Sequence, residues 1–242
     1  MSPEEYSKLS QIEKRHWFYS GKREIVRYWI WKHMTKSRNL KLLDCGAGGG
    51  AFASEMSGHL QVTAMDDHEE SLELLRASLP PDAVVRGGCT RIPFPEGSFD
   101  IVTALDVLEH IPDDRAAVAE MIRVLKPGGL LVLTVPALMS LWSDWDVSLH
   151  HQRRYLKNNL LRLMNASAIR RLHAAYINVL AVPAIWLVRQ ARSMGLGARA
   201  RAEDWVPPMP LNALLRFLFV SLGKSRVQFP IGVGLLFVGM KK

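Results

Sequence analysis

Cofactor-type chemistry is concentrated in residues 42–50, which read LLDCGAGGG. Glycines carry no Cβ, so a ligand can approach their backbone closely, and loops of this kind bind nucleotides. Two templates fit the same letters. Gly46, Gly48 and Ala51 match the dinucleotide pattern, whereas Asp44 places a carboxylate where it can accept hydrogen bonds near a cationic amino-acid group. The position of Asp44 favours S-adenosylmethionine, and an NAD-type dinucleotide is the alternative.

A second carboxylate, Asp66, lies 22 residues after Asp44, at the end of the next apolar run. A carboxylate at this point accepts hydrogen bonds from both hydroxyls of a ribose, whichever adenosyl cofactor is bound. Asp66 therefore supports an adenosyl ligand without choosing between the two templates.

Histidine, arginine and acidic side chains form a second group with chemical potential. His110 follows an apolar run, and a later stretch adds Asp146, His150, His151, Arg153, Arg154 and Tyr155. Histidine has an ordinary pKa of about 6.5, so His110 and His151 are candidates for a general base. The later stretch has two interpretations, a substrate-side or lid segment and an internal salt-bridge network. Its aspartate and histidines lack a further ligand at a recognisable spacing, so we expect no metal site.

These residues need a scaffold, and alternating strand and helix signals predict one. Apolar runs indicate strands at 40–45, 60–66, 83–88, from 98, and at 130–136. Helical patterns lie at 22–34, 68–79 and from Pro112 to Leu125, where KPGG ends the helix. After residue 136 we expect a helix near 157–166, a strand near 173–180, an apolar insertion and a final strand at 234–242. The alternation predicts an α/β fold with a doubly wound, mostly parallel sheet.

Charge is distributed unevenly along the chain, whose formal net charge is +8. Residues 1–149 carry 16 Lys and Arg against 21 Asp and Glu, and residues 150–242 carry 15 against 2. Apolar runs at 177–188 and 211–220 mingle with the positive charges and are too short to span a bilayer. The mixture fits a lipid headgroup region better than an RNA groove, and it leaves open both peripheral contact with an anionic membrane and a buried helix among solvated arginines.

Nucleic acid is a poor fit for the basic part of the chain. It shows no recognisable RNA module and no aromatic stacking platform, so we expect no DNA partner and regard RNA as disfavoured. The two cysteines, Cys45 and Cys89, and the lack of a charged, hydrophobic secretory leader indicate a cytoplasmic protein, with membrane contact left open.

Three further motifs decide between the cofactor templates. They are GCTRIPFPEGSFDIV, LDVLEHIPD and RVLKPGGLLVLTVP, in this order after the glycine loop. Together they resemble the class I S-adenosylmethionine-dependent methyltransferases, in particular the branch that includes quinone-biosynthesis enzymes and small-molecule methyltransferases. Related bacterial proteins also share an HWF…R opening and a later HxRRY, which match His16 to Phe18 with Arg23, and His151 to Tyr155.

The resemblance implies a single domain with a Rossmann-like sheet of seven strands, the last one antiparallel. Residues 1–39 would then form a helical lid, 40–136 the cofactor-binding core, and 137–242 the substrate side. An apolar, basic and helical insertion at about 180–227 leaves three roles open: a lid, a membrane-contacting foot or a dimer surface.

The resemblance also assigns roles to individual positions. Asp44, Gly46 and Gly48 would line the methionine part of the cofactor. Asp66 would hold the ribose, and Cys89 and Thr90 would face the adenine. Leu105 is also expected to bind the cofactor. Cys89 departs from the family, which often has an acid there, and a thiol is a weak acceptor. Arg23 would pair with the cofactor carboxylate through two charge-assisted bonds. Trp17, Asp146, Arg153, Arg154 and Tyr155 would face the substrate, with an anionic group held by the two arginines.

The expected function is methyl transfer by in-line displacement from S-adenosylmethionine to an apolar or lipid-like, anionic small-molecule acceptor. Such catalysis rests on alignment and exclusion of water, with His110 or His151 removing a proton where one is present. A soluble secondary metabolite is the alternative acceptor. A non-catalytic adenosyl-binding interaction protein and an NAD-type oxidoreductase are the alternative classes, and the motifs between 98 and 136 oppose the latter.

Overall fold

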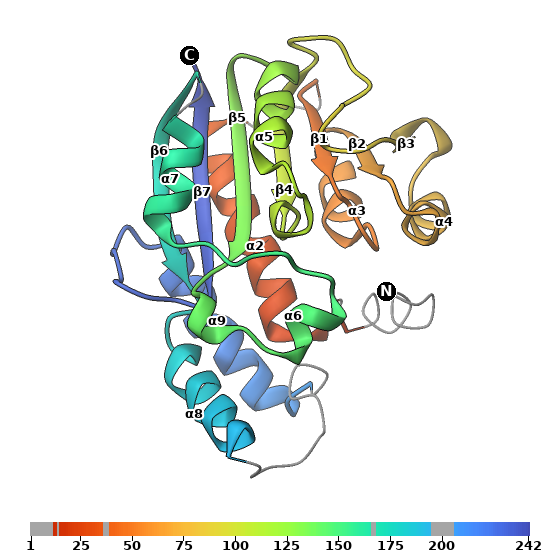
Figure 1. Ribbon diagram of the computed structural model, residues 1–242. Coiled ribbons are helices and arrows are strands. Elements are labelled where there is room, and N and C mark those ends of the chain that lie inside the picture. The colour runs from red at the N-terminus through yellow and green to blue at the C-terminus, as the bar shows by residue number, and fades with distance from the viewer. Residues whose placement is uncertain (1–11, 14, 36–38, 166–167, 195–205) are drawn as a thin grey trace.

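The computed structural model describes residues 12–13, 15–35, 39–165, 168–194 and 206–242. Seven strands form one sheet in the order β3-β2-β1-β4-β5-β7-β6 (Figure 1). The first five strands in this order are parallel to one another, and β7 runs antiparallel to both β5 and β6. The strands are β1 (Lys41–Cys45), β2 (Gln61–Asp66), β3 (Val84–Arg86), β4 (Phe99–Leu105), β5 (Leu125–Pro136), β6 (Ile169–Ile177) and β7 (Gly234–Lys241). The predicted sheet, with its antiparallel last strand, is confirmed.

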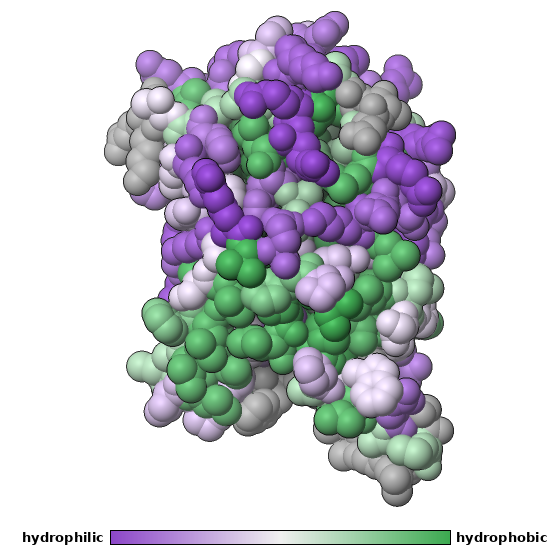
Figure 2. All heavy atoms as spheres, turned by 90° about the vertical axis from the view of Figure 1, so that its left-hand side faces the viewer, coloured by the Kyte–Doolittle hydropathy of each residue, from purple (hydrophilic) through white to green (hydrophobic). Residues whose placement is uncertain are grey.

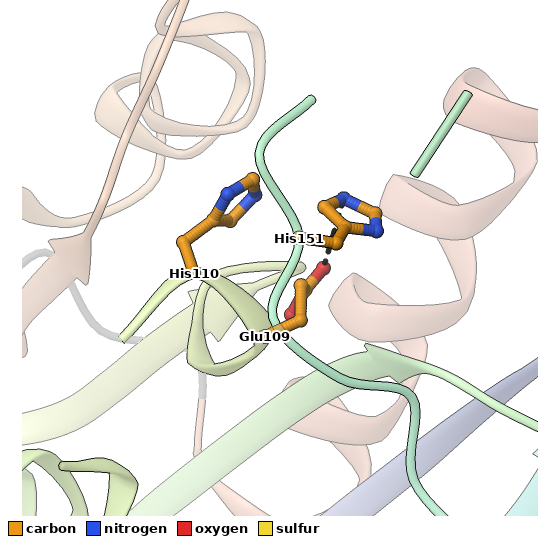
Figure 3. A group of neighbouring side chains, drawn as sticks. All are labelled: Glu109, His110 and His151. Atoms are coloured by element: carbon orange, nitrogen blue, oxygen red, sulfur yellow. Dashed lines mark ion pairs between the residues drawn. The ribbon is translucent and has the colours of Figure 1, made fainter. Parts of the chain in front are cut away.

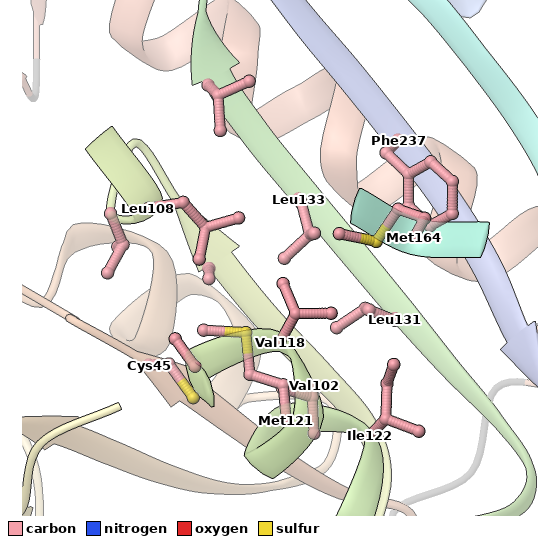
Figure 4. Close-up of a cluster of buried hydrophobic side chains, with 14 of the residues drawn as sticks. Cys45, Val102, Leu108, Val118, Met121, Ile122, Leu131, Leu133, Met164 and Phe237 are labelled. Carbon is pink, nitrogen blue, oxygen red and sulfur yellow. The ribbon is translucent and has the colours of Figure 1, made fainter. Parts of the chain in front are cut away.

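Helices cover both faces of this sheet, because most of its strands are apolar on both sides. On β5, Leu131 and Leu133 belong to one buried cluster, and Leu130 and Val132 to another. Alternate residues of a strand point to opposite faces, so each face needs its own helical cover. Figure 4 shows part of the first cluster, where Val118 and Met121 of one helix and Met164 of another meet the sheet.

The helices divide between the two faces accordingly. The cluster drawn in Figure 4 is covered by α5 (Asp114–Val124) and α7 (Lys157–Asn165). The opposite cluster takes side chains from α2 (Trp17–His33), α3 (Ala51–Ser57), α4 (Glu69–Ser78) and α9 (Met209–Lys224). The chain also forms the short α6 (Asp144–Ser148) and α8 (Ala181–Ser193). With α8 and α9, the structure confirms the expected helical insertion in the C-terminal third.

Local chemistry explains two boundaries that differ from expectation. Helix α2 begins at Trp17, earlier than predicted, because His16 caps it: Nδ1 of His16 accepts a hydrogen bond from the backbone N–H of Phe18 at 3.2 Å. Helix α5 ends at Val124, and KPGG belongs to β5 instead of ending the helix. Leu125 already pairs with Phe99 of β4, which explains the early start of the strand.

Helices α8 and α9 lie at the lower end of the molecule in Figure 1, beyond the lower ends of the β5 and β7 ribbons. In the part of the chain that the structure describes, every helix is too short or too polar to cross a bilayer.

Candidate functional site

A cavity of about 1060 Å³ lies at the carboxyl ends of β1, β2 and β4 and extends to α8 and α9. The carboxyl ends of the strands are where an open α/β sheet binds its ligands. Pockets for one drug-sized ligand usually measure about 300 to 1,000 Å³. The cavity therefore has room for an adenosyl cofactor together with an acceptor.

The glycine loop after β1 presents backbone to this cavity. Gly46, Gly48 and Gly50 have φ values of 63°, 54° and 74°, a left-handed conformation that side-chain-bearing residues rarely adopt. A Cβ at Gly48 would meet nothing within 4 Å, so the space beside it is open to a ligand. The Oδ2 atom of Asp66 accepts a hydrogen bond from the Gly48 N–H at 2.9 Å, which holds the loop against β2. The loop and its open space fit an adenosyl cofactor.

Two carboxylates flank the loop in different environments. Asp44 is 3% exposed and accepts a hydrogen bond from the Thr103 hydroxyl at 2.7 Å. Burial raises its pKa to about 7, because the charged form loses water without gaining a cation. Asp66 is also buried, and its Oδ1 accepts the His68 N–H at 3.0 Å. A cation bound beside Asp44 would lower its pKa again, because it would favour the charged carboxylate.

The residues predicted to bind the cofactor all line the cavity, namely Arg23, Asp44, Gly46, Gly48, Asp66, Cys89, Thr90 and Leu105. Two of them have competing partners. Arg23 Nε donates to Glu55 Oε1 at 2.7 Å, and its Nη1 donates to the Glu13 carbonyl at 2.9 Å. Cys89 packs against the core cluster that contains Cys45. Their contacts with the cofactor stay predictions.

On the acceptor side, His151 is held by a fully buried carboxylate. Its Nδ1 lies 2.9 Å from Oδ1 of Asp146, which is 0% exposed. Asp146 also accepts two hydrogen bonds from Arg154, Nε at 2.7 Å and Nη2 at 3.0 Å, and one from the Ser143 N–H at 2.9 Å. Burial alone would raise the pKa of Asp146, but the bonds from His151 and Arg154 outweigh it and lower that pKa. An ionised Asp146 favours the tautomer of His151 that carries a proton on Nδ1.

Figure 3 shows His151 beside Glu109 and His110, all of which line the cavity. Nε2 of His151 lies 4.0 Å from Oε1 of Glu109, and the two imidazole centroids are 4.7 Å apart. Glu109 is fully buried, and neither of its carboxyl oxygens has a hydrogen-bond partner among the described residues. Burial, with Asp106 nearby, raises its pKa well above the ordinary value, which favours the uncharged form of the carboxyl.

His110 differs from His151 in its surroundings. Burial and the neighbouring His151 lower its pKa to about 4, so its imidazole is neutral at neutral pH. Glu109, His110 and His151 each offer an atom within 4.8 Å of the others, a spacing that also suits a cation. The expectation that the chain holds no metal therefore stays a prediction.

Four residues expected to bind substrate form an internal network instead. Asp146, Arg153 and Tyr155 are absent from the cavity wall. Arg154 lies on the wall, but its guanidinium donates hydrogen bonds to Asp146. Arg153 pairs with Asp114 at 3.0 Å, and the Tyr155 hydroxyl donates to Asp114 at 2.8 Å. These contacts favour the internal salt-bridge network over an anion held by the two arginines, whose substrate role stays a prediction. Trp17 does line the cavity, edge-on to Phe219 at 5.6 Å.

Sequence reasoning also missed several charged residues on the cavity wall, among them the pair Lys22 and Asp106. Lys22 of α2 is buried and pairs with Asp106, which follows β4 and has a left-handed φ of 56°. The Thr134 hydroxyl donates to the other carboxylate oxygen of Asp106 at 2.8 Å. The motif LDVLEH contained Asp106 and Glu109 as a signal, but Lys22, the partner of Asp106, lies far away in the sequence.

Comparison with known proteins agrees with this geometry. Residues 43–133 match a protein family described as "Methyltransferase domain". The ubiquinone biosynthesis O-methyltransferase of Idiomarina loihiensis is 31% identical over 195 residues, which are 70% of this chain and 80% of that protein. The demethylmenaquinone methyltransferase of Staphylococcus epidermidis is 40% identical over 115 residues, 43% of this chain and 48% of that protein. The chain thus matches about half the length of this second relative.

Among solved structures, an S-adenosylmethionine-dependent methyltransferase from Thermotoga maritima superimposes with a TM-score of 0.64 at 15% identity. The superposition covers 99% of this chain and 96% of the other. At this identity the likeness shows the fold alone.

Proposed function

The chain belongs to the class I S-adenosylmethionine-dependent methyltransferases, in the branch that resembles the quinone-biosynthesis enzymes. We propose that it methylates an apolar or lipid-like small-molecule acceptor at a hydroxyl presented to His151. The proposal names the acceptor class, the acceptor atom and the base.

The observation that carries this proposal is the pairing of His151 with Asp146 on the cavity wall. An ionised carboxylate on Nδ1 leaves the lone pair of Nε2 for another group, as in other histidines that act as general bases. His110 is the weaker candidate, because a pKa of about 4 makes it a poor proton acceptor. Glu109 is buried, its carboxyl oxygens have no hydrogen-bond partner among the described residues, and its Oε1 lies 4.0 Å from Nε2 of His151. This supports a position beside both side chains for the acceptor hydroxyl.

When bound, S-adenosylmethionine supplies a methyl carbon on a sulfonium, an electrophile with a good leaving group. The residues of the chain align the acceptor, exclude water and remove its proton. Nε2 of His151 would take the proton of the acceptor hydroxyl as the oxygen of that hydroxyl receives the methyl group. Asp146 would stabilise the resulting imidazolium, and Glu109, whose raised pKa favours the protonated carboxyl, would orient the hydroxyl through a hydrogen bond.

The apolar character of the acceptor is supported by the far end of the cavity. There the wall consists of Ile185 of α8, Leu215, Leu218 and Leu222 of α9, and Phe229. Each arginine or lysine on the described wall, Lys22, Arg23 and Arg154, already has a carboxylate partner. We therefore place an ionisable hydroxyl, and no permanently charged group, at the polar end of the acceptor.

The names of two relatives agree with a lipid-like acceptor, since one refers to ubiquinone biosynthesis and the other to demethylmenaquinone. The proposal includes contact of the chain with an anionic membrane, from which such an acceptor would be drawn. A soluble metabolite is the competing acceptor.

The test uses purified protein and a donor labelled with tritium in its methyl group. The protein is incubated separately with an organic-solvent extract and an aqueous extract of bacterial cells. We expect label in a product that partitions into the organic phase, with and without EDTA. Labelled product in the aqueous phase alone would favour the soluble metabolite. No transfer to either extract, with S-adenosylhomocysteine still bound in calorimetry, would favour the non-catalytic adenosyl-binding protein.

A further inference from the structure

The outer surface of α8 and α9 is apolar although it faces solvent. The largest exposed apolar side chains of α9 are Met209, Leu214 and Phe217, at 80%, 53% and 66% exposure. Those of α8 are Trp186 and Leu187, at 48% and 60%. Figure 2 shows hydrophobic residues gathered over the lower part of the molecule, with hydrophilic residues above them. Contiguous apolar patches of this kind mark interaction surfaces.

The polar side chains of α9 explain why its exposed face is apolar, because three of them point to the rest of the protein. Asn212 accepts the Trp17 N–H at 2.9 Å, and Arg216 and Lys224 both reach Glu24 of α2 at 2.6 Å. An ordinary surface helix turns its charges outward and its apolar face inward. In α9 the charged residues are used to attach the helix to α2, and apolar residues remain on the outside.

The inner faces of the same two helices are apolar as well, since they line the far end of the cavity. Three wall residues, Leu180, Ala184 and Leu218, are themselves exposed, so the cavity reaches the surface at these helices. Helices that carry apolar residues on both their inner and their outer faces are covered by protein or by lipid. A protein or lipid surface that covers the outer face of α8 and α9 would therefore also cover the place where the cavity reaches the surface at these helices.

Charge distinguishes a lipid cover from a second copy of the chain. Residues 181–194 and 206–224 contain no Asp or Glu, and residues 150–242 carry 15 basic against 2 acidic residues. A second copy would bring the same positive charge to the contact, whereas an anionic bilayer attracts it. Apolar side chains with a tryptophan among them suit a depth of about 5–10 Å in the headgroup region.

We propose that Leu180, Trp186, Leu187, Met209, Leu214 and Phe217 form a bilayer-docking face through which the cavity opens directly into an anionic membrane. The inference rests on the proposed function, because it gives a lipid-like acceptor its route to His151. The acceptor enters between α8 and α9 from the bilayer, and its polar end moves toward β4. Docking and methyl transfer then use opposite sides of the same two helices.

Flotation with lipid vesicles tests the docking face. Vesicles of phosphatidylcholine are compared with vesicles that contain about 30% phosphatidylglycerol, at low and at high salt. We expect the protein to float with the anionic vesicles and less so at high salt. The double variant Leu214→Ser with Phe217→Ser should lower vesicle affinity by about tenfold or more, since each lost apolar side chain weakens partition. Leu156→Ser is the matched control, because Leu156 is exposed at 47% but lies outside α8 and α9.

A second measurement keeps docking separate from folding and from the cofactor site. Calorimetric binding of S-adenosylhomocysteine should be unchanged in the double variant, which shows that the variant is folded. If the wild type binds S-adenosylhomocysteine but does not float with the anionic vesicles, the docking face is overturned and the methyltransferase proposal stands. A concentration-dependent dimer in light scattering that the double variant abolishes would also overturn it, in favour of a second copy. Failure of the wild type to bind S-adenosylhomocysteine would instead count against the proposed function.

Discussion

The cofactor side and the acceptor side of the cavity hold their polar groups in different ways. Around the glycine loop, Asp66 bonds to the backbone of Gly48 and His68, which are 18 and 2 residues away. On the acceptor side, α9 is attached through contacts such as Asn212 to Trp17, which are 195 residues apart. The bonds of Asp66 therefore involve backbone near in sequence, whereas α9 is attached by contacts that the whole fold brings together.

This difference teaches where function resides in each half. The cofactor side presents main-chain groups at strand ends. Such groups do not depend on particular side chains, so the same glycine pattern serves proteins that act on different substrates. The acceptor side depends on individual side-chain pairs, such as Asp146 with His151 and Glu24 with Lys224. We expect substitutions on the acceptor side to change the chemistry and those on the cofactor side to change binding of the donor.

The largest effect is expected at His151. His151→Gln removes the proton acceptor but keeps a side chain of similar size, so kcat should fall by about 10²- to 10⁴-fold. Binding of S-adenosylhomocysteine should stay the same. Steady-state kinetics with the acceptor found in the extracts measures the first quantity and calorimetry the second. Arg153→Ala is the control: its guanidinium faces Asp114 and the Pro112 carbonyl, so KM should change by less than about twofold. An unchanged kcat in His151→Gln would contradict the role of the base.

A smaller effect is expected at Asp66, in the other half. Asp66→Ala removes the carboxylate that we expect to accept two ribose hydroxyl bonds, each worth about 1.5 kcal/mol or more, so the Kd for S-adenosylhomocysteine should rise by about 100-fold. Calorimetry is the measurement. Asp82→Ala, an exposed carboxylate outside the cavity wall, should leave the Kd unchanged. If both variants bound equally well, the glycine loop would not be the donor site.

The smallest effect is a pH dependence set by Asp44. Its pKa is raised from 3.8 to about 7 by burial, and a ligand with an ammonium group binds best to the ionised carboxylate. Below pH 7 that carboxylate must first lose its proton, so affinity should fall by about tenfold per pH unit. Above pH 7 this contribution should be constant. Calorimetry between pH 6 and pH 8 tests this, and Asp44→Asn should remove the slope.

The two halves also differed in how far the sequence predicted them. Strands ending in Asp44 and Asp66 follow from apolar runs and glycines, and both residues do line the cavity. The contact of Arg153 and Tyr155 with Asp114 was not predicted, because Asp114 lies about 40 residues away. Lys22 was missed for the same reason, since Asp106 lies 84 residues further along. Local patterns report strand ends, but not which distant charges neutralise one another.

The position of β7 has a consequence for the synthesis of the chain. Residues 234–241 form a strand that lies between β5 and β6 and pairs with both of them. A polypeptide emerging from the ribosome can assemble β1 to β5 with their helices, but β6 has no strand to join until β7 has left the exit tunnel. Pairing at such long sequence separation is also slow. The donor half can therefore form first, and the apolar helices α8 and α9 are made before the strand that completes the sheet.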